Sequence, residues 1–155
     1  MSFHKVLEDT KIRHLDLASP TTVRPSTTVE ETIKKMRTVR CACALVTEGG
    51  KLVGIFTERD VLSKVIGAPE SLRRPVRDLM TPNPITLKVD DSLHDAIDTM
   101  SEGGYRNIPI VDDDGRAVAS LPASEIVNFI VSHFPKAVYN LPPHLEQRMA
   151  TQEGA

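Results

Sequence analysis

The chain has 155 residues, of which 40% are hydrophobic and 26% charged, and its 19 basic and 21 acidic side chains give a formal net charge of −2. This composition is typical of a folded globular protein and offers no basic surface for nucleic acid or an anionic membrane. No apolar run approaches the roughly 20 residues of a membrane-spanning helix, and the charged N-terminus lacks the apolar stretch of a signal peptide. We therefore expect a cytoplasmic protein with neither nucleic acid nor a membrane as its partner.

An internal repeat organises the chain. Residues 28–36 are matched 64 positions later by residues 92–100. Each segment opens with a hydroxyl residue followed three positions later by an acidic one, and each carries apolar residues at helical spacing, so two equivalent helices are predicted, each starting with a capping box. Residues 20–23 and 84–87, at the same displacement just upstream, each predict a short strand.

Each copy then continues with a second strand, a Gly- or Asp-rich turn, a third strand and a second helix. These are expected at 42–46, 48–50, 52–56 and 58–66 in the first copy, and at 108–111, 113–115, 117–121 and 123–131 in the second. Each unit is β-α-β-β-α, and units that cannot bury an apolar face alone are expected to share one core. The prediction is an α/β (α+β) fold with two repeats packed sheet to sheet about a pseudo-twofold axis and helices outside.

Prolines mark the predicted boundaries. Pro69 and Pro75 interrupt regular structure between the copies, and Pro135, Pro142 and Pro143 fall in a polar C-terminal part. The predicted organisation is an N-terminal extension 1–14, a first repeat 15–68, a linker 69–79, a second repeat 80–134 and a tail 135–155, of which residues 138–141 are expected to pack on the protein.

Residues 54–60, Gly-Ile-Phe-Thr-Glu-Arg-Asp, are predicted to run from a strand directly into a helix. Thr57 is a good N-cap, and Asp60 follows three residues later. A helix start favours phosphate, and a carboxylate beside it can accept hydrogen bonds from a vicinal diol, so the segment suits a ribose phosphate. On these seven residues alone, a plain capping box that binds nothing is the favoured interpretation. The motifs in the rest of the chain favour a ligand site instead.

Three motifs in order carry a resemblance to a known family. Residues 54–60 match a Gly-h-x-Thr/Ser-x-x-Asp ligand motif, where h is apolar, residues 78–82 (Asp-Leu-Met-Thr-Pro) resemble the usual start of a repeat, and residues 107–111 (Asn-Ile-Pro-Ile-Val) match its second strand. Over roughly residues 15–135 the chain resembles the tandem cystathionine-β-synthase (CBS) domain pair, or Bateman module. The resemblance implies a non-catalytic energy or metabolite sensor that binds AMP, ADP or ATP as a ligand rather than a cofactor, with S-adenosylmethionine as a further candidate.

Carried over residue by residue, the resemblance implies one intact nucleotide site between the repeats. Asp60 would hold the ribose hydroxyls and Thr57 a hydroxyl or phosphate, while Ile85 and Thr86 would contact the adenine edge through backbone groups. Arg106 is the expected phosphate partner because a planar guanidinium suits that geometry, and a solvated arginine at a strand end is an equally good interpretation. The predicted site comprises Phe56, Thr57, Arg59, Asp60, Ile85, Thr86, Arg106, Asn107 and Pro109.

The second repeat departs from the ligand motif. At a displacement of 65, Asp60 becomes Glu125, on a longer arm, and Thr57 becomes Pro122, which fits a first helical position but has no hydroxyl. A second site is therefore expected to be weak or empty. Its predicted members are Thr21, Thr22, Cys41, Ala42, Pro122 and Glu125.

The cysteines, histidines and acidic clusters form no recognisable metal or catalytic motif. Cys41 and Cys43 are poorly spaced to bridge each other, and zinc would need a second pair, so inert reduced thiols are expected. The histidines (His4, His14, His94, His133 and His144) are scattered, and His94 is predicted to be solvated. Residues 112–114 lack the later ligands of an EF-hand and indicate a turn. We expect neither a metal site nor a catalytic set.

Two alternatives remain open beside a nucleotide sensor. The broken motif of the second repeat favours a protein–protein interaction module with a vestigial ligand cleft, whereas Thr57 and Asp60 argue against it. An enzyme such as a nucleotide hydrolase ranks low, because the sequence shows no nucleophile, base and metal cluster together. The resemblance further implies a homodimer formed through exposed apolar helix faces, with output through an unidentified effector protein.

Overall fold

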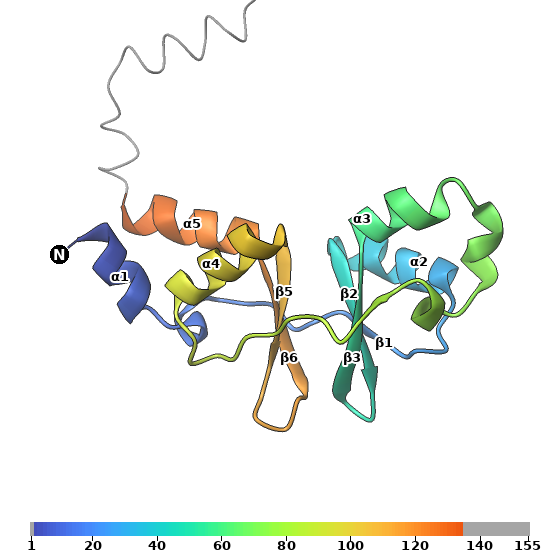
Figure 1. Ribbon diagram of the computed structural model, residues 1–155, viewed down its shortest axis with the longest axis horizontal. Coiled ribbons are helices and arrows are strands. Elements are labelled where there is room, and N and C mark those ends of the chain that lie inside the picture. Colours follow the sequence, from blue (N-terminus) through green and yellow to red (C-terminus); the bar gives the residue numbers. More distant parts are fainter. Residues whose placement is uncertain (1, 135–155) are drawn as a thin grey trace, which may run out of the picture. The chain divides into compact units, whose positions relative to one another are not determined.

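The computed structural model describes residues 2–134, which divide into two compact units after residue 123. The predicted packing of residues 138–141 lies outside the described part. None of the helices between residues 2 and 134 is long and apolar enough to cross a membrane. The elements of Figure 1 are α1 (Phe3–Asp9), β1 (Thr22–Val23), α2 (Val29–Val39), β2 (Cys43–Glu48), β3 (Lys51–Thr57), α3 (Glu58–Asp60), β4 (Thr81–Pro82), α4 (Leu93–Gly103), β5 (Asn107–Val111), β6 (Ala117–Pro122) and α5 (Ala123–His133).

The first repeat builds a four-stranded sheet in the order β1-β2-β3-β4. β1 runs parallel to β2, and β2 and β3 form an antiparallel hairpin whose two-residue turn, Gly49-Gly50, has φ values of 62° and 84°. Positive φ at both turn positions matches the right-handed strand twist, which explains why glycine stands at both. β4 pairs antiparallel with the other side of β3, where Gly54 lies opposite Pro82 and a Cβ on Gly54 would collide with the Met80 thioether.

The second repeat builds a two-stranded antiparallel sheet from β5 and β6. The strand predicted at 84–87 is reduced to one parallel bridge, between Leu87 and Ile110. The reason is local: the chain still bonds to β3 at Asn83, whose N–H donates to the Val53 carbonyl, and it reaches β5 only at Leu87. Residues 84–86 therefore lie between the two sheets.

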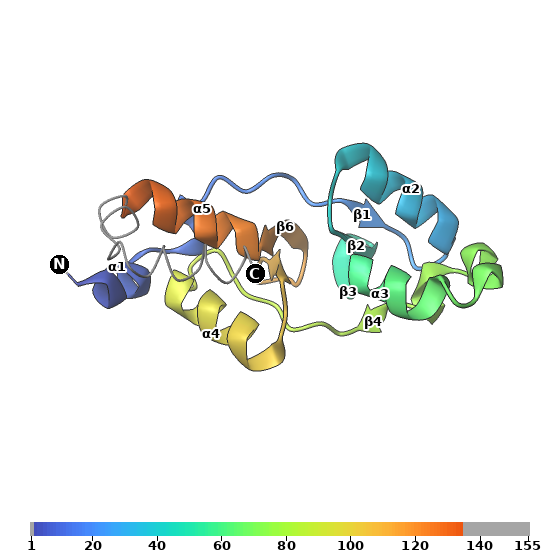
Figure 2. The ribbon, with the colours of Figure 1, turned by 90° about the horizontal axis from the view of Figure 1, so that it is seen from above.

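The helices α2 and α4 each start against a segment that precedes the helix of the other repeat, and we call these segments, residues 10–13 and 74–76, the exchanged segments. Lys11 bridges Ser92 at the start of α4, and Pro75 bridges Thr28 at the start of α2. Lys11 and Pro75 are 64 residues apart, as are Thr28 and Ser92, so the repeat extends upstream to these segments. Ile12 and Val76, at equivalent positions, are both 0% exposed. α1, just before the first exchanged segment, lies beside α4 (Figure 1 and Figure 2).

The central hairpin has two buried faces, as strand alternation requires. One carries Ala44, Val46 and Phe56, in a core with residues of α2 and of the segments that follow β3. The other carries Cys43, Leu45 and Ile55 and packs against Ala117. On that face the Cys43 Sγ lies 3.3 Å from the Ser120 Oγ of β6, so the two sheets meet face to face and the predicted α/β fold is confirmed.

The helix predicted at 58–66 is present in two parts. α3 continues directly into a π-helical turn, Val61–Val65, in which the Ile66 N–H donates to the Val61 carbonyl at 3.2 Å. In the second unit, α5 buries Ile126 and exposes Val127 and Val131.

Candidate functional site

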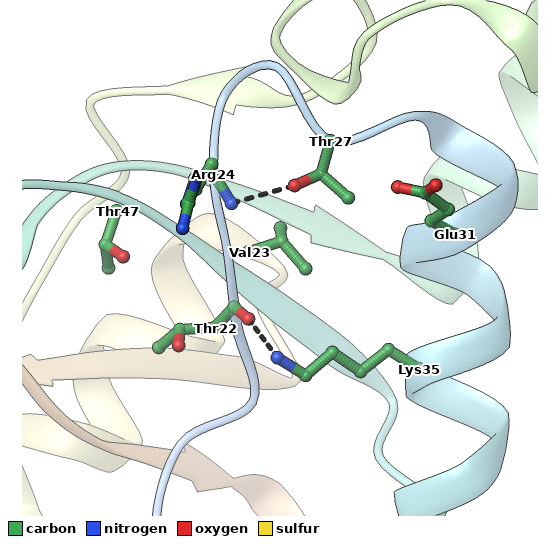
Figure 3. A pocket seen from close by; sticks show the side chains of 7 residues that line it. All are labelled: Thr22, Val23, Arg24, Thr27, Glu31, Lys35 and Thr47. Atoms are coloured by element: carbon green, nitrogen blue, oxygen red, sulfur yellow. Dashed lines mark hydrogen bonds between the residues drawn. The ribbon is translucent and has the colours of Figure 1, made fainter.

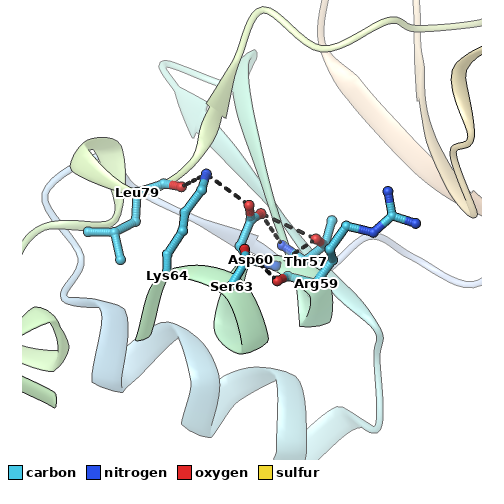
Figure 4. Close-up of polar contacts among 6 residues, drawn as sticks. All are labelled: Thr57, Arg59, Asp60, Ser63, Lys64 and Leu79. Atoms are coloured by element: carbon cyan, nitrogen blue, oxygen red, sulfur yellow. Dashed lines mark hydrogen bonds and ion pairs between the residues drawn. The ribbon is translucent and has the colours of Figure 1, made fainter. Parts of the chain in front are cut away.

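The candidate site begins where β3 runs into α3 (Figure 4). Thr57 has an extended backbone and caps the helix, and its Oγ1 accepts a hydrogen bond from the Asp60 N–H at 3.3 Å. The Asp60 carboxylate returns the contact by accepting from the Thr57 N–H at 2.9 Å. The capping box that residues 54–60 predict is therefore present, and it holds a carboxylate and a hydroxyl together at the end of a strand.

Asp60 is 7% exposed, and its carboxylate is already surrounded by donors. Oδ2 accepts from the backbone and the hydroxyl of Thr57, while Oδ1 pairs with the Lys64 ammonium at 2.9 Å. Lys64 also donates to the Leu79 carbonyl at 2.7 Å (Figure 4). A carboxylate offers about four acceptor positions, and three are in use, so a diol would take the remaining one or displace Lys64.

Arg59 connects this motif to the second repeat. Its Nη2 lies 3.4 Å from the Gly104 carbonyl, at the C-cap of α4. Gly104 stands two residues before Arg106, whose side chain is exposed and whose carbonyl accepts from the Ala123 N–H at 2.8 Å. The sequence predicts Arg59 as a member of the nucleotide site. Its guanidinium is exposed and directed to the segment that leads to Arg106 and Asn107.

The other members of the predicted site differ in how far they are exposed. Ile85 is exposed and Thr86 half-buried, in the segment between the two sheets, and Asn107 starts β5 opposite Pro122. Phe56 and Pro109, by contrast, are fully buried. Burial places these two side chains in the core, so in this structure neither side chain is available to a ligand.

The residues of the predicted second site fall on separate elements. Thr21 and Thr22 lie at β1, Cys41 and Ala42 just before β2, and Pro122 at the end of β6, while Glu125 lies on α5 of the second unit. Ala42 accepts from the Glu58 N–H at 3.0 Å, as Arg106 does from Ala123 in the other repeat.

The thiols next to these positions differ in burial. Cys43 is buried and Cys41 half-buried, and both are free. Burial, the largest cause, raises the pKa of the Cys43 thiol to about 11, so it stays protonated at neutral pH. A protonated thiol is a poor nucleophile and a poor metal ligand.

A pocket of about 460 Å³ lies between β1 and α2 (Figure 3). It contains Thr22 of the predicted second site and no residue of the first. Its lining is mostly polar, and Lys35 is held by the Thr22 carbonyl at 2.6 Å. The sequence does not predict this pocket because three separate segments form it. Its lining residues are Thr22, Val23, Arg24, Thr27, Glu31, Lys35 and Thr47.

His94 differs from its predicted state. Instead of a solvated side chain, it is half-buried, with Nδ1 3.3 Å from the Asp98 Oδ2 and its ring in edge contact with the ring of His4. The expectation failed because His4, 90 positions away in sequence, comes to α4 only through the docking of the first exchanged segment.

Comparison with known proteins identifies the family. The CBS domain family model matches residues 7–67 and 76–132. The CBS domain-containing protein CBSCBSPB3 of Arabidopsis thaliana is 34% identical over 113 residues, which cover 71% of this chain and 20% of that protein. The chain thus spans about a fifth of the length of this relative and of CBSCBSPB2, which it also matches.

Solved structures share the fold. The CBS domain pair of protein MJ0100, in complex with 5′-methylthioadenosine and S-adenosyl-L-methionine, has a TM-score of 0.73 at 24% identity and covers 80% of this chain and 98% of that one. The CBS domain protein PAE2072 from Pyrobaculum aerophilum, complexed with AMP, has a TM-score of 0.70 at 19% identity, with 91% and 98% covered. With both repeats matched by the family model and the fold shared with solved pairs, the chain belongs to the CBS domain family.

Proposed function

We propose that the chain is a non-catalytic regulatory module that binds an adenine nucleotide of the AMP, ADP or ATP class at the Thr57–Asp60 junction. The observation that carries the proposal is the geometry of that junction: a carboxylate fixed beside a hydroxyl, with the Arg59 guanidinium directed toward the segment of Arg106. A fixed carboxylate suits the ribose diol, and two guanidinium groups suit phosphate. The ligands of MJ0100 and PAE2072 contain adenosine, which supports this ligand class.

Lys64 occupies an acceptor position that a nucleotide would need in the proposed site. Its ammonium occupies Asp60 Oδ1 and the Leu79 carbonyl. A ribose diol would compete with it for Oδ1, and Leu79 belongs to the segment that leads into β4. Ligand binding is therefore expected to alter the contact between the helix and this connecting segment, which provides a route for a signal to reach an effector protein.

Nucleotide binding is expected to depend on the charge of Asp60 and not on helix capping alone. Asp60→Asn keeps an acceptor for the Thr57 N–H but removes the charge, so affinity should fall about 10- to 100-fold, as for loss of a charged hydrogen bond. Wild-type protein at 100 times the dissociation constant should gain about 2.7 kcal/mol of stability, a shift of about 5–10 °C. Thermal unfolding with AMP, ADP, ATP, NAD, S-adenosylmethionine and GTP, followed by calorimetric titration, measures both.

Asp95→Asn is the matched control, because Asp95 and Ser92 form the same capping box at the start of α4. It should lose as much helix-cap stability as Asp60→Asn yet bind the nucleotide with wild-type affinity. Equal affinity in Asp60→Asn and wild type would contradict the proposed site. An absence of any shift at millimolar nucleotide would favour the alternative, an interaction module with a vestigial cleft.

We infer that the chain also forms a homodimer through two exposed apolar pairs. Leu62 and Ile66 are 69% and 67% exposed, one turn apart after α3. Val127 and Val131, displaced from them by 65 residues, are 56% and 40% exposed on α5. Paired exposed apolar side chains at equivalent places in both repeats are typical of an interaction surface.

The double variant Leu62→Glu/Ile66→Glu is expected to convert a dimer to a monomer, because association would bury the introduced charges. Light scattering coupled to size-exclusion chromatography gives the mass directly. Val118→Glu, at an exposed apolar position on β6, is the control and should leave the mass unchanged. A wild-type protein that elutes as a monomer at high micromolar concentration would remove the homodimer from the proposal.

A further inference from the structure

Three metal-ligating side chains meet where α1 lies beside α4, away from the proposed nucleotide site. His4 and Glu8 come from α1 and His94 from α4, and one ligand atom of each lies within 4.8 Å of the others. The His4 Nε2 is 3.0 Å from the Glu8 Oε1. The rings of His4 and His94 meet edge to face, with centroids 4.7 Å apart. Residues separated by 90 positions in sequence therefore converge on one point.

The framework that holds these side chains is built from backbone contacts. The Leu93 N–H donates to the Thr10 carbonyl, and the Ile12 N–H donates to the Asp91 carbonyl, both at 2.9 Å. Leu7, between His4 and Glu8, is buried, so α1 is anchored on the side next to the ligands. Adjustment of the cluster thus needs side-chain rotation and not movement of the helices.

Asp98 supplies the outer contact that ligating histidines characteristically have. Its Oδ2 lies 3.3 Å from the His94 Nδ1, one helical turn along α4. A carboxylate that accepts a hydrogen bond from Nδ1–H fixes the tautomer and leaves the Nε2 lone pair for a metal. The arrangement is a carboxylate–histidine pair on α4 facing a histidine–carboxylate pair on α1.

We propose that His4, Glu8 and His94 bind a divalent transition-metal ion of the zinc class, which fastens α1 to α4. Two imidazoles and one carboxylate are a known zinc donor set, and they leave a fourth position for water. Metal–ligand bonds of about 2.0–2.2 Å place tetrahedral donors about 3.3 Å apart. His4 and Glu8, at 3.0 Å, are within a few tenths of an ångström of this spacing, and side-chain rotation would bring the third donor, which lies within 4.8 Å, to it.

Without a metal, the same contacts would be an exposed pair, His4 with Glu8, and a partly buried pair, His94 with Asp98, each within one helix. The His4 and Glu8 side chains are 65% and 46% exposed, and exposed pairs of this kind contribute little to stability. A metal site predicts something that such pairs do not: metal affinity depends on residues from both helices together. It rests on α1 and α4 and is independent of the nucleotide site.

Cobalt(II) titration of the full chain, without a polyhistidine tag and after treatment with a chelator, tests the proposal. One equivalent of Co²⁺ should produce a visible d–d absorption band that Zn²⁺ abolishes. His94→Gln should remove the band, and Asp98→Ala should weaken Co²⁺ affinity about 10- to 100-fold. His133→Gln, on α5, is the matched control and should bind as wild type does.

Hydrogen exchange supplies a second readout, because Zn²⁺ should slow exchange of the α1 amides in wild type and not in His94→Gln. The altered side chains are at least partly exposed, so the variants are expected to fold, and circular dichroism checks this. A Co²⁺ band that persists in His94→Gln, or no band in wild type, would overturn the proposal. A failure of the protein to bind nucleotide would not affect the metal proposal.

Discussion

Replacement of Phe56 by alanine is expected to lower the free energy of unfolding by about 3–5 kcal/mol. Phe56 is 0% exposed and packs with Ala44, Val46 and Val65 in the core of the first repeat. Removal of the ring forfeits its burial and leaves a cavity that the surrounding strands can only partly close. Because domains of this kind are stable by about 5–15 kcal/mol, the loss is a large share of the total. Urea unfolding followed by circular dichroism measures it.

Val118→Ala is the control for Phe56, because Val118 is 41% exposed on β6 and lies outside the proposed dimer pairs. Its change should stay within about 0.5 kcal/mol of wild type. Phe56→Leu, which keeps most of the buried volume, should lose much less than Phe56→Ala. A change below about 1 kcal/mol in Phe56→Ala would mean that the ring is not packed as described and would restore Phe56 as a direct ligand contact.

Ile12→Ala is expected to cost about 2–5 kcal/mol, although Ile12 lies in the part of the sequence predicted as an N-terminal extension. The residue is 0% exposed, and its N–H is bonded to the Asp91 carbonyl at the start of α4. The first exchanged segment is therefore part of the core of the second repeat. The midpoint and slope of urea unfolding give the free energy.

Arg13→Ala tests whether surface contacts of the same segment matter. Arg13 forms an exposed ion pair with Asp90, and such pairs contribute about 0–1 kcal/mol. A loss in Ile12→Ala no greater than in Arg13→Ala would show that the N-terminal segment does not pack against α4. Val76→Ala, at the equivalent place in the other exchanged segment, should also be destabilising.

Features encoded over short stretches were predictable from the sequence. The helices expected from residues 28 and 92 are α2 and α4, because both have a capping residue and apolar residues in helical register. Ser92 forms the reciprocal capping box with Asp95, whereas Thr28 only accepts from the Glu31 N–H. The two hairpins were likewise marked by their Gly and Asp turns.

Features that depend on distant partners were not predictable. β4 is two residues long and contains Pro82, so nothing in its own sequence marks a strand, and it exists because Gly54 leaves room beside β3. Local spacing gave Thr57 and Asp60 of the candidate site. Lys64, four residues after Asp60, was visible in the sequence as an ion-pair partner and was missed. The i, i+4 spacings of His4 with Glu8 and of His94 with Asp98 were also visible, but their convergence was not.

The exchanged segments have a consequence for how the protein forms on the ribosome. The first repeat is synthesised first, yet Val76, which seals its core, and β4, which covers the edge of β3, follow its last helix in the chain. Until these residues emerge, the nascent first repeat presents an open strand edge, which is a site for unwanted pairing. Residues 10–13 must wait longer still, for α4. Folding of the first repeat is therefore expected to wait until residue 82 has emerged, and packing of residues 10–13 until α4 has emerged.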